Sequence, residues 1–140
     1  MYKINKEKIF YDTTADTTVA INQDTGIYYS INGLSSEVFN FIVKGAKTDD
    51  ILAALQAIPD APADIEERLN VFVNTLLDLQ MFIPADSVAL EIQFNPELAV
   101  QDNFTLSFIE FSDAQEMLLA DPITEYEYID YENWKPEIEK

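Results

Sequence analysis

One stretch of the chain decides the fold, and it reads Val19-Ala-Ile-Asn-Gln-Asp-Thr-Gly-Ile-Tyr-Tyr-Ser-Ile-Asn-Gly33. On either side of the central loop Gln23–Gly26, apolar and polar side chains alternate, which is the period of half-buried strands. Gly26 stands in that loop, where hairpins often need a positive φ angle. The stretch therefore predicts a β-hairpin. A further strand over Ile9–Thr14 would make a small antiparallel sheet of three strands.

Three helices are predicted after the hairpin, because apolar residues recur there at i, i+3 and i+4. Each has an expected start and stop: Ser35 or Ser36 to Gly45, Thr48 to Pro59, and residues 62–81. Phe82–Pro84 is expected to close the module as a short exposed strand or turn. Residues 1–84 therefore predict an α+β domain of winged-helix-like order, with a three-stranded antiparallel sheet followed by three helices.

The composition excludes several kinds of chemistry. The 140 residues include no cysteine and no histidine, so thiolate chemistry and the commonest general base and metal ligand are missing. We expect no enzyme, no cofactor and no metal site. The formal net charge of −18 would repel a phosphate backbone, so nucleic-acid binding is not expected. No apolar run is long enough to span a membrane and the N-terminus shows no hydrophobic signal region, which predicts a soluble cytoplasmic protein with no membrane partner.

The order of the predicted elements resembles that of the PqqD-like family. The residues that carry the resemblance are the hairpin Ala20–Gly33, then Val38-Phe39, Gly45, Thr48-Asp-Asp-Ile51 and Leu55. In that family a hairpin ends in a Leu-Asn-like step and is followed by a helix, a glycine and a second helix that opens on threonine. Ile31 stands before Asn32 where leucine is more usual. The resemblance covers roughly residues 8–84.

This resemblance implies a RiPP recognition element, a non-catalytic protein that binds ribosomally made, post-translationally modified peptides. Such a protein holds the leader segment of a precursor peptide and presents it to a modifying enzyme. The leader is expected to add as a strand to the last strand of the small sheet, against the third helix, because an open edge leaves backbone groups that an extended peptide can satisfy. The peptide-binding residues predicted in this way are Ile27, Tyr28, Tyr29, Ser30 and Ile31 on the edge, and Arg68, Leu69, Phe72, Val73 and Leu77 on the third helix.

Arg68 is the only arginine of the chain, and two roles are open for it. Its guanidinium could pair with a carboxylate of the leader. It could equally form a surface ion pair with Asp64, four residues earlier on the same helix. The flank of the helix that faces the peptide is also open, and exposed sheet edges allow a homodimer by strand exchange.

Residues 85–140 are predicted as an acidic extension, with fourteen Asp and Glu against two Lys and Arg. Alternating apolar residues predict two short strands, over Val88–Phe94 and Phe104–Phe108. Turns are expected between these strands, at Asn95–Glu97 and at residues 101–103. A short helix is expected from Ser112, followed by a partly disordered tail that is rich in acids and tyrosine.

Three uses of this extension are open. It could place a strand of its own on the sheet edge as an internal plug. It could dock on a basic surface of a partner enzyme as a scaffold. It could also be a fused substrate, delivered in cis to a modifying enzyme. A winged-helix DNA-binding protein is a further alternative, but residues 62–81 carry one arginine against four acids.

Overall fold

The computed structural model describes residues 1–111, so the predicted helix from Ser112 and the acidic tail lie outside the described residues. The described part is an α+β structure with antiparallel sheets. Its elements in chain order are β1 (Tyr2–Ile4), β2 (Ile9–Thr14), β3 (Thr17–Asn22), β4 (Tyr28–Asn32), α1 (Leu34–Val43), α2 (Thr48–Gln56), α3 (Ile65–Asp78), β5 (Phe82–Pro84), α4 (Pro96–Gln101) and β6 (Ile109–Phe111).

The main sheet has four strands in the order β2-β3-β4-β6, and all neighbours run antiparallel. The three predicted strands are present as β2, β3 and β4. The prediction of a three-stranded sheet is wrong, because β6 from the acidic extension joins at β4. Two further short strands, β1 and β5, form a separate pair. The winged-helix likeness stays a prediction.

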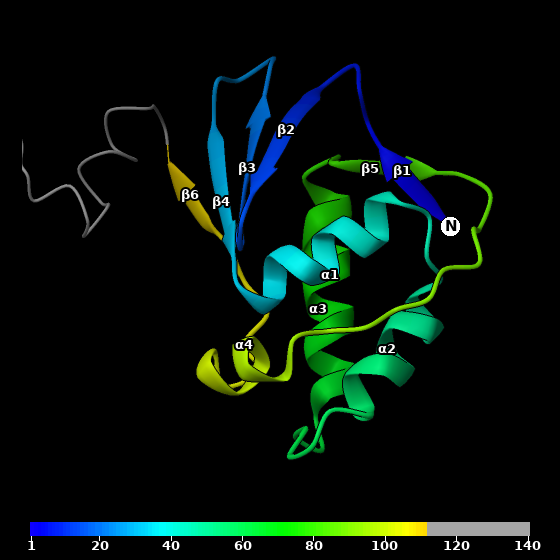
Figure 1. The fold of residues 1–140 in the computed structure, drawn as a ribbon. Coiled ribbons are helices and arrows are strands. Elements are labelled where there is room, and N and C mark those ends of the chain that lie inside the picture. Colours follow the sequence, from blue (N-terminus) through cyan, green and yellow to red (C-terminus); the bar gives the residue numbers. More distant parts are fainter. Residues whose placement is uncertain (112–140) are drawn as a thin grey trace, which may run out of the picture.

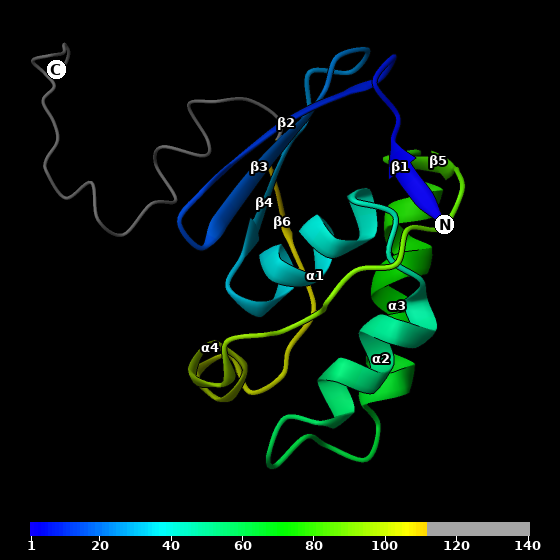
Figure 2. The same ribbon diagram turned by 45° about the vertical axis from the view of Figure 1, so that its right-hand side comes forward.

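The helices cover one face of this sheet. In both views α1 lies between the four-stranded sheet and the helices α2 and α3 (Figure 1 and Figure 2). Phe39 of α1 is fully buried there and packs on two rings, those of Tyr11 and Phe82, at centroid distances of 5.5 Å each. Phe82 is buried, so the prediction of an exposed closing strand is wrong for this residue. The pair β1–β5 thus belongs to the core through β5.

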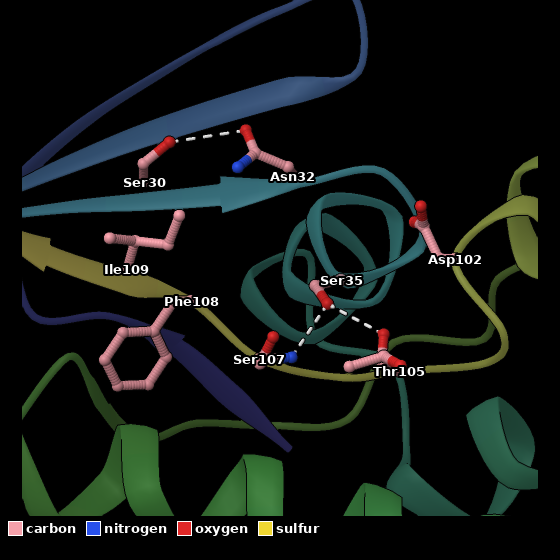
Figure 3. Close-up of a pocket in the computed structure, with 8 residues that line it drawn as sticks. All are labelled: Ser30, Asn32, Ser35, Asp102, Thr105, Ser107, Phe108 and Ile109. Atoms are coloured by element: carbon pink, nitrogen blue, oxygen red, sulfur yellow. Dashed lines mark hydrogen bonds between the residues drawn. The ribbon is translucent and has the colours of Figure 1, made fainter. Parts of the chain in front are cut away.

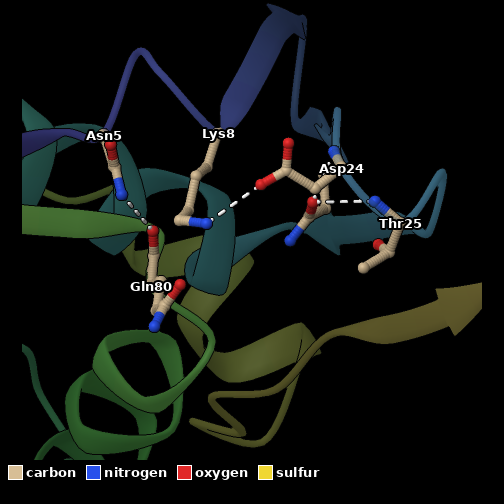
Figure 4. A network of polar contacts seen from close by, with 6 residues as sticks. Asn5, Lys8, Asp24, Thr25 and Gln80 are labelled. Atoms are coloured by element: carbon tan, nitrogen blue, oxygen red, sulfur yellow. Dashed lines mark hydrogen bonds and ion pairs between the residues drawn. The ribbon is translucent and has the colours of Figure 1, made fainter.

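The predicted hairpin is confirmed as β3 and β4, and its loop is held by local polar contacts. The side-chain oxygen of Asn22 accepts hydrogen bonds from the backbone N–H groups of Asp24 and Thr25, at 2.9 and 3.1 Å. Gly26 adopts a φ angle of +76°, as the turn requires. Figure 4 shows Lys8 reaching across from the start of β2 to Asp24, at 2.9 Å. Asparagine and glycine chemistry therefore sets this turn.

Helix starts differ from the prediction. Helix α1 begins at Leu34 with Gly33 as its N-cap, and α2 begins at Thr48 with Lys47 as its N-cap, each without a side-chain capping bond. Ser35, Ser36 and Thr48 therefore lie inside helices and are not caps. The third helix is shorter than residues 62–81, spanning Ile65–Asp78. In the described chain, no helix combines the length and hydrophobicity that crossing a bilayer would need.

The extension also differs from the prediction. Residues 88–94 form no strand; they cross the surface as a connector, in which Phe94 packs edge-on against Phe41 at 5.3 Å. The turn expected at Asn95–Glu97 is the start of helix α4. Asn95 caps it by accepting a hydrogen bond from the N–H of Glu97 at 2.9 Å, and Pro96 occupies the first turn.

A buried polar network joins the hairpin to α1. The Thr18 hydroxyl is fully buried and lies 2.7 Å from the hydroxyls of both Thr13 and Ser36. The amide of Asn40 donates to the same Thr18 oxygen at 3.2 Å. Buried polar groups stay favourable only while they are paired, so this network fixes how the sheet sits on the helix.

Replacing Thr18 with valine keeps the shape of the side chain and removes the shared hydroxyl. We expect Thr18→Val to lower the free energy of unfolding by about 1–3 kcal/mol, because two hydroxyls and an amide each lose a partner. Thr14→Val, on the exposed side of β2, is the matched control and should leave stability almost unchanged. Urea denaturation measures both, and equal midpoints would contradict the role given to the network.

Candidate functional site

The predicted peptide edge is occupied by the protein's own extension. Strand β6 pairs with β4 in antiparallel register, with Tyr28 opposite Phe111, Tyr29 opposite Glu110 and Ser30 opposite Ile109. Figure 1 shows β6 as the outermost strand beside β4. The extension therefore places a strand of its own on this edge, although the paired residues are 109–111 and the strand predicted at Phe104–Phe108 is wrong.

The ladder shows which residues of β4 offer backbone groups to this edge. In antiparallel strands successive residues turn their N–H and C=O groups to opposite sides. The N–H of Asn22 donates to the carbonyl of Ile27 at 2.9 Å. The backbone N–H and C=O groups of Ile27, Tyr29 and Ile31 therefore face β3. The backbone groups of Tyr28 and Ser30 consequently face β6.

Beyond Ser30 the two chain segments separate, and a cavity of about 180 Å³ opens between them. Ser35 of α1 bridges this gap with its hydroxyl. It donates to the carbonyl of Thr105 at 3.2 Å and accepts from the N–H of Ser107 at 2.9 Å (Figure 3). A side chain therefore continues the backbone pairing where β4 has ended. Polar and apolar residues line the cavity: Ser30, Asn32, Ser35, Asp102, Thr105, Ser107, Phe108 and Ile109.

Asp102 anchors the other end of the same segment. Its carboxylate accepts a hydrogen bond from the N–H of Leu34, the first residue of α1, at 2.9 Å. An anion is favoured at a helix N-terminus, where N–H groups lack partners. Gly33 makes this contact possible, because a Cβ atom there would overlap the Asp102 carboxylate. Its φ angle of +61° also favours glycine.

Arg68 of α3 holds the segment from the helix side. Its Nη1 atom donates to the carbonyls of Asn103 and Phe104, at 3.0 and 3.2 Å. Its Nε atom also makes the predicted ion pair with Asp64, at 3.0 Å. Arg68 therefore contacts backbone oxygens of the turn that follows α4, where Asn103 and Phe104 have positive φ angles, and not a carboxylate of the segment.

The side chains of this segment alternate between the core and solvent. Phe104 is buried, Leu106 and Phe108 pack partly against the core, and the residues between them are exposed. Phe108 meets Tyr29 edge-on, with ring centroids 5.6 Å apart. In Figure 3 Phe108 points to the side on which the helices lie. Burial raises the pKa of Tyr29, and the nearby carboxylate of Glu110 raises it further.

The predicted site residues fall into three groups. Arg68 and the strand residues Tyr28, Tyr29 and Ser30 contact or pair with residues 103–111. Ile27 lies just before β4, and its carbonyl bonds within the hairpin. The others point into the hydrophobic core or its margin: Ile31, Leu69, Phe72 and Val73 are buried, and Leu77 is partly buried.

The prediction missed Ser35, Asp102 and Gly33. Ser35 had been given a capping role because it precedes an apolar helical pattern. Asp102 had been placed in a turn, and no local pattern distinguishes it from its acidic neighbours. Both act through contacts about seventy residues away in sequence, which local patterns do not encode.

The fold and the site define a small α+β domain that holds an extended segment of chain at one edge of its sheet. Residues 17–81 match the model of the protein family described as coenzyme PQQ synthesis protein D (PqqD). This part of the chain is therefore a PqqD-like domain, and the resemblance is confirmed. The family's description associates it with the synthesis of coenzyme PQQ. No curated protein and no solved structure matches the chain.

The matched range begins with β3 and includes β4, α1, α2 and α3. The occupied edge, Ser35 and Arg68 all lie within it. The segment that occupies the edge, residues 102–111, lies outside it. The PqqD-like part thus supplies the site, and the extension supplies the occupant.

Removing the Ser35 hydroxyl tests the bridge over the cavity. We expect Ser35→Ala to speed hydrogen exchange at the Ser107 amide about fivefold, because losing such a bond costs about 1 kcal/mol. Ser30→Ala is the matched control, since the Ser30 hydroxyl lines the same cavity but bonds to Asn32. Unchanged exchange in the Ser35 variant would contradict this assignment.

Glu37 of α1 binds the connector before α4, and its pKa gives a second prediction. Its two carboxylate oxygens accept from the N–H of Asn95, at 3.3 and 3.4 Å. Burial raises the Glu37 pKa, the Asn95 bond opposes this, and the charge of Asp16 adds to it. Because the folded state holds this proton more tightly than the unfolded state, its stabilising contribution is present below the ordinary carboxyl pKa. That contribution is lost as pH rises through the raised value.

We therefore expect Glu37→Gln to gain stability relative to the wild type as pH rises through that range. The quantity to measure is the difference between the two free energies of unfolding at each pH. Glu91→Gln, an exposed acid in the same connector, controls for the change in net charge. A difference that stays constant with pH, or falls, would contradict the raised pKa.

Proposed function

We propose that this protein is a cytoplasmic, non-catalytic adaptor that holds the leader segment of a ribosomally made precursor peptide and presents it to a modifying enzyme. One observation carries the proposal: the β4 edge of the PqqD-like domain already accepts an extended antiparallel segment, residues 109–111. A sheet edge that takes one such segment has the backbone geometry to take another.

The contacts at this edge favour a peptide as the ligand. Ser35 and Arg68 bind only main-chain atoms of the segment, at Asn103, Phe104, Thr105 and Ser107. Main-chain atoms are common to all peptides, so Ser35 would hold a peptide of different sequence in the same way, whereas Arg68 would do so only for a peptide that forms the same turn. The choice of peptide then depends on side-chain contacts such as that of Tyr29 with Phe108.

The absence of histidine and cysteine from the sequence supports an adaptor over a catalyst. The chemistry on the bound peptide is assigned to a separate modifying enzyme, which is the second partner that the proposal requires. We retain no role for a cofactor or for nucleic acid. The net charge of −18 suits docking on a basic enzyme surface.

A fused substrate is the second candidate. It is favoured by the position of β6, because the acidic, tyrosine-rich stretch at residues 125–134 follows this strand in the sequence. In this candidate the bound segment takes the place of the leader, and the stretch that follows it takes the place of the core peptide that the enzyme modifies. Mass spectrometry of the chain, isolated from cells that contain the modifying enzyme, tests this candidate. A tail of unmodified mass would contradict it.

A spin-labelled peptide tests the adaptor proposal in the full chain. The probe has the sequence of residues 101–111 and carries the label at its N-terminus. At millimolar concentration we expect it to broaden the amide signals of Tyr28 and Ser30, because it exchanges into the β4 edge. A peptide of the same composition, shuffled so that Phe and Leu no longer alternate, is the control.

Broadening at the outer edge of β2, around Phe10 and Asp12, would mean that the peptide adds to the opposite side of the sheet. That result, or equal effects of the two peptides, would contradict the proposed site.

A further inference from the structure

We infer that residues 102–111 are a tethered substitute for the peptide ligand, so that the chain regulates its own peptide site by competition in cis. This inference rests on the proposed function and adds to it. It assigns a regulatory segment within the chain and gives the chemistry of the peptide that would displace it.

The segment is held from end to end by the PqqD-like domain. Asp102 binds the N-terminus of α1, Arg68 binds two carbonyls, Ser35 binds one carbonyl and one N–H, and β4 pairs with the last three residues. The segment therefore occupies the free edge of β4 and also the polar groups at the start of α1. A peptide in trans that bound in the same way could do so only after the segment had left.

Within residues 1–111, the strand pairing that holds the segment is short. Strand β6 has three residues, and two of them, Ile109 and Glu110, are exposed. Short edge pairing with exposed side chains belongs to the part of a protein that opens most easily. The remaining contacts are hydrogen bonds to α1 and α3, together with the packing of Phe104, Leu106 and Phe108 against the core. Release of the occupant would expose Phe104, Leu106 and Phe108, whereas the rings that pack on Phe39, those of Tyr11 and Phe82, belong to other elements.

The side chains of the segment define the ligand that would replace it. An acid reaches the N-terminus of α1, and apolar side chains follow at every second position as Phe104, Leu106 and Phe108. The intervening side chains are exposed, and at Asn103 a positive φ angle of 55° favours asparagine or glycine. The competing peptide is thus a segment of the pattern Asp-x-Phe-x-Leu-x-Phe that forms a turn over its first three residues, as residues 102–104 do, and has an aromatic residue at the last position to meet Tyr29.

Tethering gives the occupant an advantage over any peptide in solution. A short connection gives the tethered segment an effective concentration of about 1 mM. If the segment itself binds with micromolar to submillimolar affinity, the apparent affinity of a free peptide falls by the ratio of this concentration to that dissociation constant. Releasing the segment should therefore strengthen binding in trans by about tenfold or more. Variants of Ser35 or Arg68 are unsuitable for this test, because they would weaken both ligands together.

Two proline variants of the full chain distinguish release of the occupant from the general effect of placing a proline in this strand. By the alternation of the ladder, the N–H of Ile109 faces β4 and that of Glu110 faces away, since Ile109 lies opposite Ser30. Ile109→Pro removes a group that faces the partner strand, whereas Glu110→Pro removes one that faces outward, where an edge strand tolerates proline. Both side chains are exposed, so neither variant opens the core.

The probe is a fluorescent peptide with the sequence of residues 101–111, and its dissociation constant is measured for the wild type and both variants. We expect Ile109→Pro to bind it about tenfold or more tightly than the wild type, and Glu110→Pro to bind it as the wild type does. Equal binding by all three chains would overturn competition in cis and leave the proposed function standing. No binding by any of them, including Ile109→Pro, would overturn the proposed function itself.

Hydrogen exchange on the unaltered chain gives a test that does not depend on how the variants fold. Adding the unlabelled peptide in excess should speed exchange at the amide of Ser107, because the segment leaves its partners. Protection at Ser107 that survives saturating peptide would overturn the inference. A wild-type dimer that Ile109→Pro converts to a monomer would also overturn it, since the occupant would then come from a second copy by strand exchange.

Discussion

The arrangement of the described chain depends on the need of β4 for backbone partners on both of its sides. One side is satisfied by β3 through the hairpin, which is a local connection. The other side has no neighbour within the PqqD-like range, because the chain leaves β4 directly into α1. An unpaired edge invites any extended segment that reaches it. Here residues 109–111 fill that place after a path of about eighty residues.

The junction between β4 and α1 turns this requirement into a selective site. Gly33 ends the strand with a positive φ angle and leaves room for the Asp102 carboxylate. Leu34 then offers its free N–H to that carboxylate, and Ser35, one residue later, offers its hydroxyl to the backbone of residues 105 and 107. Three consecutive residues thus bind the segment: Gly33 leaves room for it, the Leu34 N–H binds its carboxylate, and the Ser35 hydroxyl binds its backbone. Arg68 completes the hold from α3.

Much of the fold follows from local patterns. The hairpin was predicted because its alternation and its glycine loop are local, and the three helices because their apolar periodicity is strong. The starts of α1 and α2 were predicted wrongly, since serine and threonine can also enter a helix when a tertiary partner binds their hydroxyls. Ser36 does so with Thr18, and Ser35 does so with the extension. Helix α4 was missed because its six residues carry little periodic signal.

The sequence by itself determined which faces of the chain are apolar. The alternation through Phe104, Leu106 and Phe108 correctly indicated which side chains of this segment pack against the core, although the strand predicted there is absent and Phe104 lies in a turn. Only the tertiary structure decided which edge that segment occupies and which of its residues form the ladder. Pairing between strands uses main-chain groups that are alike in every residue, so it is selected by the position of the open edge, by Gly33 and by distant side chains such as Arg68.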